Sequence, residues 1–511
     1  MITVLSGITE YQAKTSPNKT AAIFQNKKIN YTTLNEKSNQ IANCLINSGI
    51  HSHENTAILL KNSPDYIYSY FGIIKTGAVC VPLNTFLKAE ELKYILNDSQ
   101  AKFIITMDCF MDELNKILPE LPHLKSVIML EQSEKHLSLQ KIYSTYHKTD
   151  PLIKKNENDT AIIIYTSGTT GHPKGAMLTH KNILSNVKAI LEVIKIKNKD
   201  RVLDILPMFH SFTLTICILV PLYTGISIII LESVKPFSNV LKAIFKHRAT
   251  IIVCVPSLYQ ILSQAKIPGF LLMFNPIRLC VSGGGPLPSV VLENFEKKFK
   301  IPLLEGYGLS EASPVVSIMP EHKPRRQGSI GVSIPGVDVR IVNDNCEELP
   351  AGEIGELIVR GPNVMKGYLN QIEETDKTIK NNWLFTGDLA KKDNDNYLYI
   401  VDRKKDMILY HGINIYPREI EDVLYKHPKT AECAVIGIKD KYLKETPKVF
   451  IVLKEGLTAS IDEFQLFCKD KLADYKIPHH FEFIQALPKT STGKILKRTL
   501  RDQANEGNTK I

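Results

Sequence analysis

Short apolar runs alternate with longer amphipathic segments over roughly the first 400 residues of the chain. The amphipathic segment LNEKSNQIANCLINSG, at residues 34–49, predicts a helix that ends at Gly49, because glycine readily takes the left-handed backbone found after a helix C-terminus. Strands that are apolar on both faces and separated by helices predict α/β layers with largely parallel sheets. The predicted strands are 56–60, 79–83, 102–106, 126–130, 161–165, 226–231, 250–255 and 279–283.

The pattern changes after about Gly331. Shorter strands with Gly and Asp turns follow in VDVRIV, GEIGELIVRG and YLYIVD, which predicts a β-rich antiparallel subdomain. The charged stretch DRKKDMI occupies residues 402–408, and REIEDVLYKHP and AECAVIGIKD then begin a small α+β unit. We therefore expect a large N-terminal domain at 1–402, a junction at 403–408 and a C-terminal domain at 409–511.

Residues 205–231 contain no Lys, Arg, Asp or Glu, which raises the question of a membrane span. A spanning helix needs about 20 apolar residues. Here Pro207, His210, Pro221 and Gly225 interrupt the run, and its last residues are β-branched. The pattern predicts a buried helix followed by a core strand, and no transmembrane segment.

Composition excludes several classes. At 511 residues more than one domain is expected, and 44% hydrophobic with 23% charged residues is typical of a globular protein. The net charge of +10 is scattered among acids, which disfavours a nucleic-acid partner. The nine cysteines are dispersed without a C-x-x-C pair, and the N-terminus MITVLSGITEYQAK lacks signal-peptide features. We expect a cytoplasmic protein without a disulfide framework or zinc site.

The stretch YTSGTTGHPKGAMLTH, from residue 165, has the composition of a phosphate-binding loop. Its glycines at 168, 171 and 175 let backbone N–H groups approach an anion, its Ser and Thr hydroxyls add donors, and Lys174 adds a charge. It matches neither the Walker loop nor G-x-G-x-x-G. Taken alone, it could also be a surface turn.

Other motifs offer complementary groups. VSGGGPLP (281–288) could admit a flat ring, and EGYGLSEASP (305–314) offers Tyr307 for stacking, Ser310 for a phosphate and Glu311 for a metal. LFTGDLA (384–390) presents Asp388, whose carboxylate could accept the two hydroxyls of a ribose. VDRKKDMI and PKTSTGKILKR add Arg403 and Lys494. Each motif by itself could equally be a turn or a solvated side chain.

Together these motifs closely resemble the acyl-adenylate-forming superfamily, which contains acyl-CoA synthetases, firefly luciferase and the adenylation domains of nonribosomal peptide synthetases. YTSGTTGHPKG, LPMFHSF, EGYGLSEASP, TGD, DRKKDMI, HGINIYPREIE and PKTSTGK occur in family order, and the resemblance covers nearly the whole chain. The motifs, notably EGYGLSEASP with SGGGPLP, are most similar to those of bacterial medium- or long-chain fatty acyl-CoA synthetases. The resemblance implies that a carboxylic acid reacts with MgATP to give acyl-AMP and pyrophosphate, and that the thiol of coenzyme A then displaces AMP.

The resemblance also implies residue roles. Catalytic roles fall to Lys494, which would bridge the carboxylate and the α-phosphate, to Ser310 at that phosphate, to Glu311 as the Mg²⁺ ligand, and to His210 beside the reacting carboxylate. Lys405 would be the hinge of a mobile C-terminal domain, and Gly412 would line the tunnel for coenzyme A. The implied ATP-binding and AMP-binding residues are Thr166, Ser167, Gly168, Thr169, Thr170, Gly171, Lys174, Gly284, Gly285, Glu305, Gly306, Tyr307, Asp388 and Arg403.

The sequence constrains the identity of the acyl substrate less than it constrains the reaction. Where amino-acid-activating relatives carry an Asp, this chain has Ser211, and no acid lies between Asp204 and Glu232, which disfavours amino acids. The apolar lining suggested by Phe212, Val315 and their neighbours favours a fatty acid over an aryl acid, although the same residues could be plain core. Alternatives are an aryl-acid CoA ligase, a ligase that loads an acyl carrier protein, and an inactive nucleotide-binding scaffold. A homodimer is left open.

Overall fold

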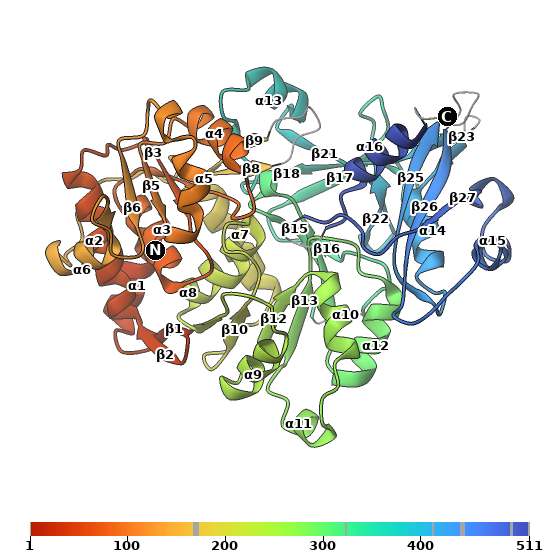
Figure 1. Ribbon diagram of the computed structural model, residues 1–511, viewed down its shortest axis with the longest axis horizontal. Helices are drawn as coiled ribbons and strands as arrows, with labels where there is room; N and C mark the ends of the chain where they lie inside the picture. The colour runs from red at the N-terminus through yellow and green to blue at the C-terminus, as the bar shows by residue number, and fades with distance from the viewer. Residues whose placement is uncertain are drawn as a thin grey trace.

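The computed structural model describes residues 2–166, 173–321, 324–410, 413–439, 445–490 and 494–508. Figure 1 shows the N-terminal segments at one side, the middle of the chain below, and the C-terminal unit with α16 and β25 at the other side. The described strands form two large sheets, a smaller antiparallel sheet, a two-stranded sheet and a C-terminal sheet. The arrangement is the α/β architecture that the sequence predicts.

The first large sheet has eight strands in the order β19-β9-β8-β4-β3-β5-β6-β7. Its centre is parallel, while β9 and β19 run antiparallel to their neighbours at one edge. The predicted strands between 56 and 165 all belong to it. Its strands are β3 (Asn55–Leu59), β4 (Val79–Pro82), β5 (Phe103–Thr106), β6 (Ser126–Met129), β7 (Leu137–Ser138), β8 (Thr160–Thr166), β9 (Lys174–Thr179) and β19 (Gly367–Tyr368).

The second large sheet has nine strands in the order β16-β15-β14-β13-β12-β10-β11-β1-β2. The strands from β14 to β1 are parallel, and antiparallel pairs close both edges. The strands are β1 (Thr20–Phe24), β2 (Lys27–Asn30), β10 (Arg201–Asp204), β11 (Ser227–Ile230), β12 (Ile251–Cys254), β13 (Leu279–Ser282), β14 (Leu303–Gly308), β15 (Val315–Ile318) and β16 (Val332–Ser333).

The largest core is shared by the two sheets and by the helices α2 (Tyr31–Asn47), α3 (Pro64–Lys75) and α7 (His180–Val193). Helix α2 begins where the Asn30 side chain accepts a hydrogen bond from the Thr33 N–H, and it ends as predicted, with Gly49 in the left-handed region at φ +84°. Helices α9 (Ser238–Lys246), α10 (Pro256–Gln264) and α12 (Ser289–Phe299) contribute to a second core against the nine-stranded sheet.

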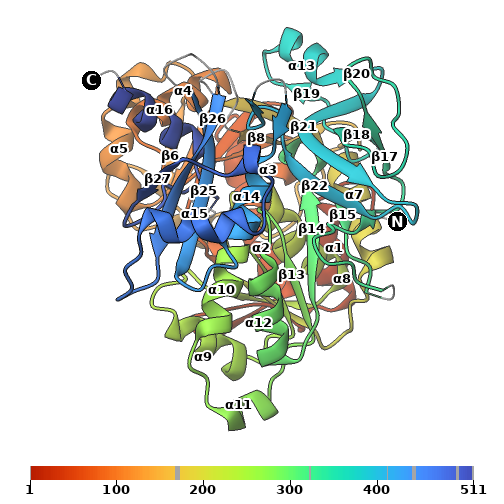
Figure 2. The same ribbon diagram turned by 90° about the vertical axis from the view of Figure 1, so that its right-hand side faces the viewer.

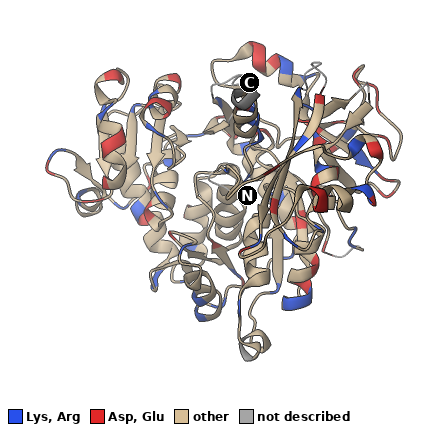
Figure 3. Ribbon diagram, turned by 45° about the vertical axis from the view of Figure 1, so that its right-hand side comes forward, with Lys and Arg blue, Asp and Glu red and all other residues tan. Residues whose placement is uncertain are grey.

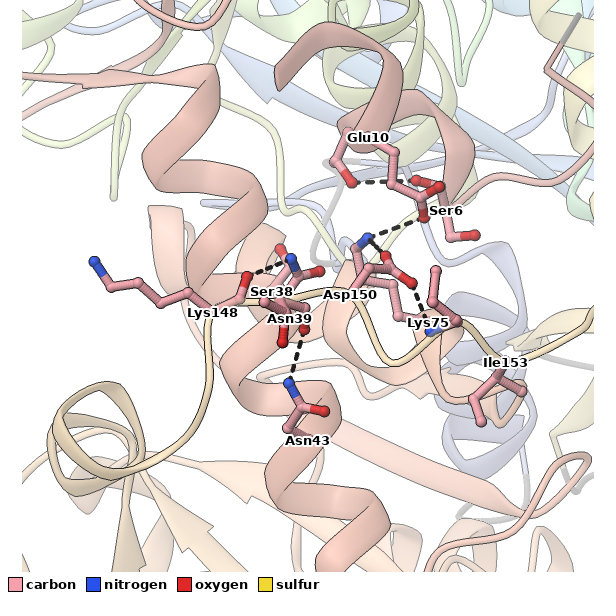
Figure 4. Close-up of polar contacts among 12 residues, drawn as sticks. Ser6, Glu10, Ser38, Asn39, Asn43, Lys75, Lys148, Asp150 and Ile153 are labelled. Atoms are coloured by element: carbon pink, nitrogen blue, oxygen red, sulfur yellow. Dashed lines mark hydrogen bonds and ion pairs between the residues drawn. The ribbon is translucent and has the colours of Figure 1, made fainter. Parts of the chain in front are cut away.

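An ion triad around a buried lysine fastens the N-terminal helix to this core (Figure 4). Lys75, at the end of α3, is fully buried, and its ammonium lies 3.0 Å from Glu10 of α1 (Gly7–Thr15) and 2.6 Å from Asp150. A buried lysine without such partners would be costly. The triad therefore ties α1 and the segment before β8 to α3.

The uncharged stretch 205–231 forms a π-helix at Thr213–Leu219, then α8 (Val220–Thr224) and β11. The predicted buried helix and core strand are confirmed, but the π-helical form differs from expectation, because residue patterns do not distinguish it from an α-helix. Within the described residues, no helix is long and apolar enough to cross a membrane.

The β-rich part is a five-stranded antiparallel sheet of β17 (Asp338–Val342), β18 (Gly355–Arg360), β20 (Ile379–Lys380), β21 (Trp383–Lys392) and β22 (Leu398–Arg403). The C-terminal unit packs α14 (Pro417–Leu424), α15 (Ile461–Lys469) and α16 (Lys497–Asn508) around β25 (Thr430–Lys439), β26 (Glu445–Leu453) and β27 (His480–Phe483). In Figure 2 this unit faces the viewer. The predicted antiparallel and α+β characters are both confirmed.

The remaining described elements are shorter helices, strands and turns, some of which contribute to the cores or the candidate site. Figure 3 shows charges of both signs spread over the ribbon, in line with the scattered pattern in the sequence. These elements are α4 (Ala89–Asp98), α5 (Met111–Asn115), α6 (Leu139–Thr145), α11 (Gly269–Met273), α13 (Ile372–Thr378), β23 (Ile408–Tyr410), β24 (Ile413–Ile415) and 3₁₀ turns at Asp108–Phe110, Leu118–Glu120, Ser310–Ala312 and Asp474–Lys476.

Candidate active site

The pairing of β21 with β22 sets Asp388 opposite Arg403. Arg403 Nε lies 3.3 Å from Asp388 Oδ1, and the phenol of Tyr307, at the end of β14, donates to Asp388 Oδ2 at 2.6 Å. Burial, reinforced by the Asp388 charge, raises the pKa of Tyr307 well above its usual range, so the phenol stays a donor. Three residues that the sequence links to the nucleoside therefore lie together.

Lys494, which belongs to the C-terminal unit, lies near Asp388 and Arg403. The charges that act on its ammonium belong to Arg403 and Asp388 and to Asp406 and Lys405 of the junction. The Lys494 side chain is exposed to solvent, but protein surrounds much of it. The resulting desolvation is the larger cause, and the repulsion of Arg403 the smaller, that lower the pKa of Lys494 to about 8. The lysine and the carboxylate, 106 positions apart in the sequence, thus lie within range of each other's charge.

Hydrogen bonds hold Lys494 against Thr490. The Lys494 N–H donates to the hydroxyl of Thr490 at 3.1 Å, and the Thr490 N–H donates to the Lys494 carbonyl at 2.8 Å. Lys489 and Ile495 pair in a β-bridge. The sequence predicts a Ser/Thr/Gly turn here, of which residues 491–493 lie outside the described part.

Glu305 and the glycines of VSGGGPLP lie on neighbouring strands, since Ser282 of β13 pairs with Glu305 of β14. Glu305 is 7% exposed and accepts a hydrogen bond from the Leu287 N–H at 3.3 Å. Burial raises its pKa to about 7, against the opposing effect of Arg418. An uncharged or half-charged carboxyl thus borders the predicted adenine site.

The glycines keep that site open. Gly284 has φ +80°, in the left-handed region that favours glycine, and a Cβ on Gly285 would have only Pro256 near it, at 3.9 Å. A Cβ on Gly306 would lie 3.4 Å from the Ser317 carbonyl oxygen. Gly283, which the sequence does not single out, is the most constrained of the four, because its Cβ would lie 2.9 Å from the Phe212 ring.

The predicted acyl residues adjoin the predicted phosphate residues. Ser211 Oγ and Ser310 Oγ are 3.0 Å apart. Burial lowers the pKa of His210 to about 4, so its imidazole is neutral at physiological pH, and its ring lies 4.4 Å from that of Phe209. Phe212 packs against both large cores, and Val315 is buried in the first.

Glu311 is oriented by two hydroxyl groups. Thr166 at the end of β8 and Tyr368 of β19 donate to Glu311 Oε1, at 3.3 Å and 3.0 Å. Mg²⁺ in nucleotide sites is commonly held by one or two carboxylates together with phosphate oxygens, so one oriented carboxylate fits this ion. No group of three or more His, Cys, Asp or Glu side chains that could hold a metal by itself occurs in the described ranges.

Lys174, the lysine of the glycine-rich loop, is 6% exposed at the start of β9. Its ammonium forms an ion pair with Glu374 of α13 and lies 5.5 Å from the centre of the Tyr368 ring. The sequence predicts Lys174 but not Glu374 or Tyr368. Glu374 is 200 positions from Lys174 in the sequence, and no local sequence pattern predicts their contact.

Some predicted residues cannot be placed. Ser167, Gly168, Thr169, Thr170, Gly171 and Gly412 lie outside the described residues. Lys405 is exposed in the turn after β22, where the Lys404 N–H donates to the Gly387 carbonyl. The division at 402 and 408 and the hinge role of Lys405 stay predictions.

Two surface hollows lie away from these residues. One of about 400 Å³ is bordered by Arg340, Trp383 and Lys392 of the antiparallel sheet, and one of about 640 Å³ by Leu466 and Lys469 of α15. Neither is lined by a predicted site residue. The chemistry of the side chains, rather than the size of a hollow, identifies the candidate site.

Comparison with known proteins matches nearly the whole chain. The family described as AMP-binding enzyme matches residues 9–369, and its C-terminal domain matches residues 419–494. The chain is 37% identical to a long-chain-fatty-acid–CoA ligase of Bacillus subtilis (strain 168), over 98% of this chain and 95% of that protein. It is 34% identical to a ligase of the same name from Salmonella typhimurium, over 97% of this chain and 93% of that protein.

A solved structure agrees over the whole length. The crystal structure of an anthranilate CoA ligase in complex with anthranoyl-AMP superposes with a TM-score of 0.93 at 30% identity, covering 99% of this chain and 98% of that chain. The chain belongs to the AMP-binding enzyme family, and it is an AMP-forming acyl-CoA synthetase.

Proposed function

We propose that the enzyme activates a fatty acid in two steps at the site around Asp388 and Lys494. In the first step a carboxylate oxygen of the acid attacks the α-phosphorus of ATP and expels pyrophosphate, leaving acyl-AMP. In the second step the thiol of coenzyme A attacks the acyl carbon and expels AMP. The convergence of Lys494 on Asp388 and Arg403 is the observation that carries this proposal.

The charges explain why that convergence matters. The carboxylate and the triphosphate are both negative, so the reaction needs cations and hydrogen-bond donors at the point where they meet. Lys494 would supply a positive charge to the attacking oxygen and the α-phosphate, while Ser310 would donate to the same phosphate. Asp388 would accept the ribose hydroxyls, and Arg403 would hold Asp388 in place.

ATP and coenzyme A are the co-substrates of an enzyme of this family, and we further propose a requirement for Mg²⁺ at Glu311. Bound there, Mg²⁺ would draw negative charge from the phosphate oxygens. Thr166 and Tyr368 would hold the carboxylate in position. Lys174 and the loop at 166–171 would contact the outer phosphates.

For the second step, we propose that the C-terminal unit, at 409–511, turns about Lys405 and withdraws Lys494. Polar contacts tie the described part of the unit to β22 and α10. They include the Arg418 N–H on Asp402 at 2.9 Å, the Arg418 guanidinium on the Ile400 carbonyl at 2.9 Å and the Gln260 amide on the Ala431 carbonyl at 3.1 Å. Contacts of this kind can be exchanged for water, which suits a rotating domain. Gly412 would then border the path of the thiol.

The fatty-acid assignment rests on the side chains near Ser310. Ser211 is a neutral neighbour of Ser310, and His210 is neutral too, so neither supplies a negative charge to pair with a substrate ammonium. Phe212 and Val315 add apolar surface. The ligases of Bacillus subtilis and Salmonella typhimurium named above support the same class.

Aryl acids are the second candidate class. A feruloyl-CoA synthase of an Amycolatopsis species is 34% identical over 96% of this chain, and the anthranilate CoA ligase shares the fold. A carrier protein in place of coenzyme A is the second candidate acceptor. We propose a cytoplasmic location for the enzyme, supported by the nine dispersed cysteines of the sequence. The homodimer also stays a prediction.

A pyrophosphate-release assay with saturated fatty acids of increasing length, aryl acids and α-amino acids tests this assignment. Each acid is offered with coenzyme A or with an acyl carrier protein. We expect the highest kcat/KM for a fatty acid with coenzyme A, and none above background for amino acids. Preference for an aryl acid, or turnover only with the carrier protein, would replace the assigned substrate or acceptor.

A further inference from the structure

The charge of Lys174 is already neutralised within the protein. Its ammonium is nearly buried, pairs with the Glu374 carboxylate and faces the Tyr368 ring. Figure 1 shows α13, which carries Glu374, at the top of the molecule next to the β8 and β9 labels. The lysine assigned to the outer phosphates therefore has an anionic partner before any nucleotide arrives.

Glu374 is a strong partner because two lysines share it. Hydrogen bonds from Lys174 to Oε2 and from Lys377 to Oε1, the latter at 2.9 Å, lower the pKa of Glu374 to about 2. The carboxylate is therefore ionised at any pH at which the enzyme would be assayed. It presents to Lys174 what a phosphate oxygen would present, an anionic oxygen in hydrogen-bond range.

The carboxylate is also held in position by its surroundings. The hydroxyl of Thr375, next to Glu374, accepts the Tyr368 N–H at 2.9 Å and donates to the Gln371 carbonyl at 2.9 Å. Tyr368 in turn donates through its phenol to Glu311. This short network fixes the start of α13 against β19, so Glu374 reaches Lys174 without further ordering.

We propose that Glu374 is an internal competitor of ATP for Lys174 and thereby sets the affinity of the enzyme for nucleotide. The proposal rests on the proposed function in one respect, the assignment of Lys174 to the outer phosphates. When a ligand needs a group that is engaged elsewhere for most of the time, its apparent affinity is its intrinsic affinity multiplied by the fraction of time in which the group is available. The triphosphate must displace the carboxylate or bind against its repulsion, and either costs affinity.

The proposal predicts that removing the Glu374 charge tightens the binding of MgATP, whereas most substitutions in a binding site weaken it. Glu374→Gln keeps the shape of the side chain and removes its charge. We expect the Kd for MgATP, measured by calorimetric titration without acyl substrate, to fall by about three- to tenfold, as for the loss of one partly exposed ion pair. A structural role alone predicts weaker binding or no change.

Glu373→Gln is the matched control, because Glu373 is an exposed carboxylate of the same helix and the substitution changes net charge equally. We expect its Kd to stay within about twofold of the wild type, since a solvated charge at this distance is screened by salt. Tightening by both variants to the same degree would overturn the proposal in favour of a general effect of net charge.

A double-mutant cycle with Lys174→Gln completes the test. Lys174→Gln should weaken MgATP binding, and in that background Glu374→Gln should have no further effect. A Kd that rises or stays unchanged in Glu374→Gln would overturn the competition. Unaltered ATP binding in Lys174→Gln would instead overturn the phosphate role of Lys174 on which the proposal rests. Melting curves of each variant identify a loss of folding, and Glu374→Asp, which retains the charge, should retain the wild-type Kd more closely than Glu374→Gln.

Discussion

Ser211 and Ser310 are 99 residues apart in the sequence, and their hydroxyl oxygens lie 3.0 Å apart. Ser211 follows β10 in the motif MFHSF, and Ser310 follows β14 in EGYGLSEASP. The hydrogen bond brings the segment assigned to the acyl carboxylate against the segment assigned to the α-phosphate. These are the two groups that must react.

Ser310→Ala should slow adenylate formation. It removes the proposed donor to the anionic α-phosphate, and the loss of one hydrogen bond to a charged group, about 1.5–3 kcal/mol, corresponds to a roughly 10- to 100-fold lower rate. Acid-dependent exchange of pyrophosphate into ATP measures this step. Ser211→Ala serves for comparison and should cost less, because it keeps the Ser310 hydroxyl. An effect of Ser211→Ala larger than that of Ser310→Ala would contradict the assignment.

Lys494→Ala should separate the two half-reactions. Removing a preorganised cation from the point where negative charges converge typically costs roughly 10²–10³ in rate, so acyl-AMP synthesis should fall by that factor. Conversion of supplied acyl-AMP and coenzyme A to the thioester should proceed at near the normal rate, because the proposed rotation withdraws the lysine in that step. Equal losses in both steps would mean that Lys494 holds the fold or a domain contact.

The pH dependence of adenylation should reflect the same lysine. Desolvation and Arg403 lower the pKa of Lys494 to about 8, and in the proposed mechanism the protonated form stabilises the transition state. The kcat/KM for ATP should therefore fall as the pH rises above about 8. In Lys494→Arg the guanidinium stays protonated at that pH, so the descending limb should vanish even if the absolute rate is lower. A limb that persists in the arginine variant would assign it to another group.

Glu305→Gln should stabilise the protein at neutral and alkaline pH. Burial raises the pKa of Glu305 from about 4.5 to about 7, so the folded state binds the proton more tightly than the unfolded chain does. Between about pH 4.5 and pH 7, the contribution of Glu305 to the free energy of unfolding falls as the pH rises, by about 1.4 kcal/mol per pH unit at most. Glutamine cannot ionise and can still accept the Leu287 N–H through its amide oxygen.

Thermal melts at pH 5 and pH 8 check this prediction. The difference in melting temperature between Glu305→Gln and the wild type should be more positive at pH 8 than at pH 5. We expect about 2 °C or more for each kcal/mol by which the substitution raises the free energy of unfolding. Leu287→Ala, which keeps the backbone N–H, should lower both melting temperatures without this pH dependence. A difference that is the same at both pH values would show that Glu305 does not titrate in this range.

Gly412→Leu tests the thioester step. Leucine at this position should obstruct the thiol, lowering the rate of acyl transfer from supplied acyl-AMP while acid-dependent pyrophosphate exchange stays within about twofold of the wild type. Gly336→Leu, at a turn glycine outside the C-terminal unit whose φ is +77°, is the control for a glycine-to-leucine change elsewhere in the chain. Equal loss of both half-reactions in Gly412→Leu would leave Gly412 as a turn residue only.

The sequence by itself determined the strands, the layers and most of the chemistry. Runs such as 161–165 and 279–283 are apolar on both faces and can only be buried, and Gly49 stops α2 because glycine accepts a left-handed backbone. Motifs of nearby residues carry local signals too. Taken together and in family order, such motifs point to Tyr307, Ser310, Glu311, Asp388, Arg403 and Lys494 as candidate residues.

Only the tertiary structure decided which of these groups meet and what surrounds them. The pairing of Lys174 with Glu374, of Tyr368 with Glu311 and of Ser211 with Ser310 joins residues 200, 57 and 99 positions apart. Burial, which lowers the pKa of His210 and raises that of Glu305, likewise depends on atoms from distant segments. The physical reason is that side-chain periodicity is a local property of the chain, whereas contact and desolvation arise only when separate elements pack together.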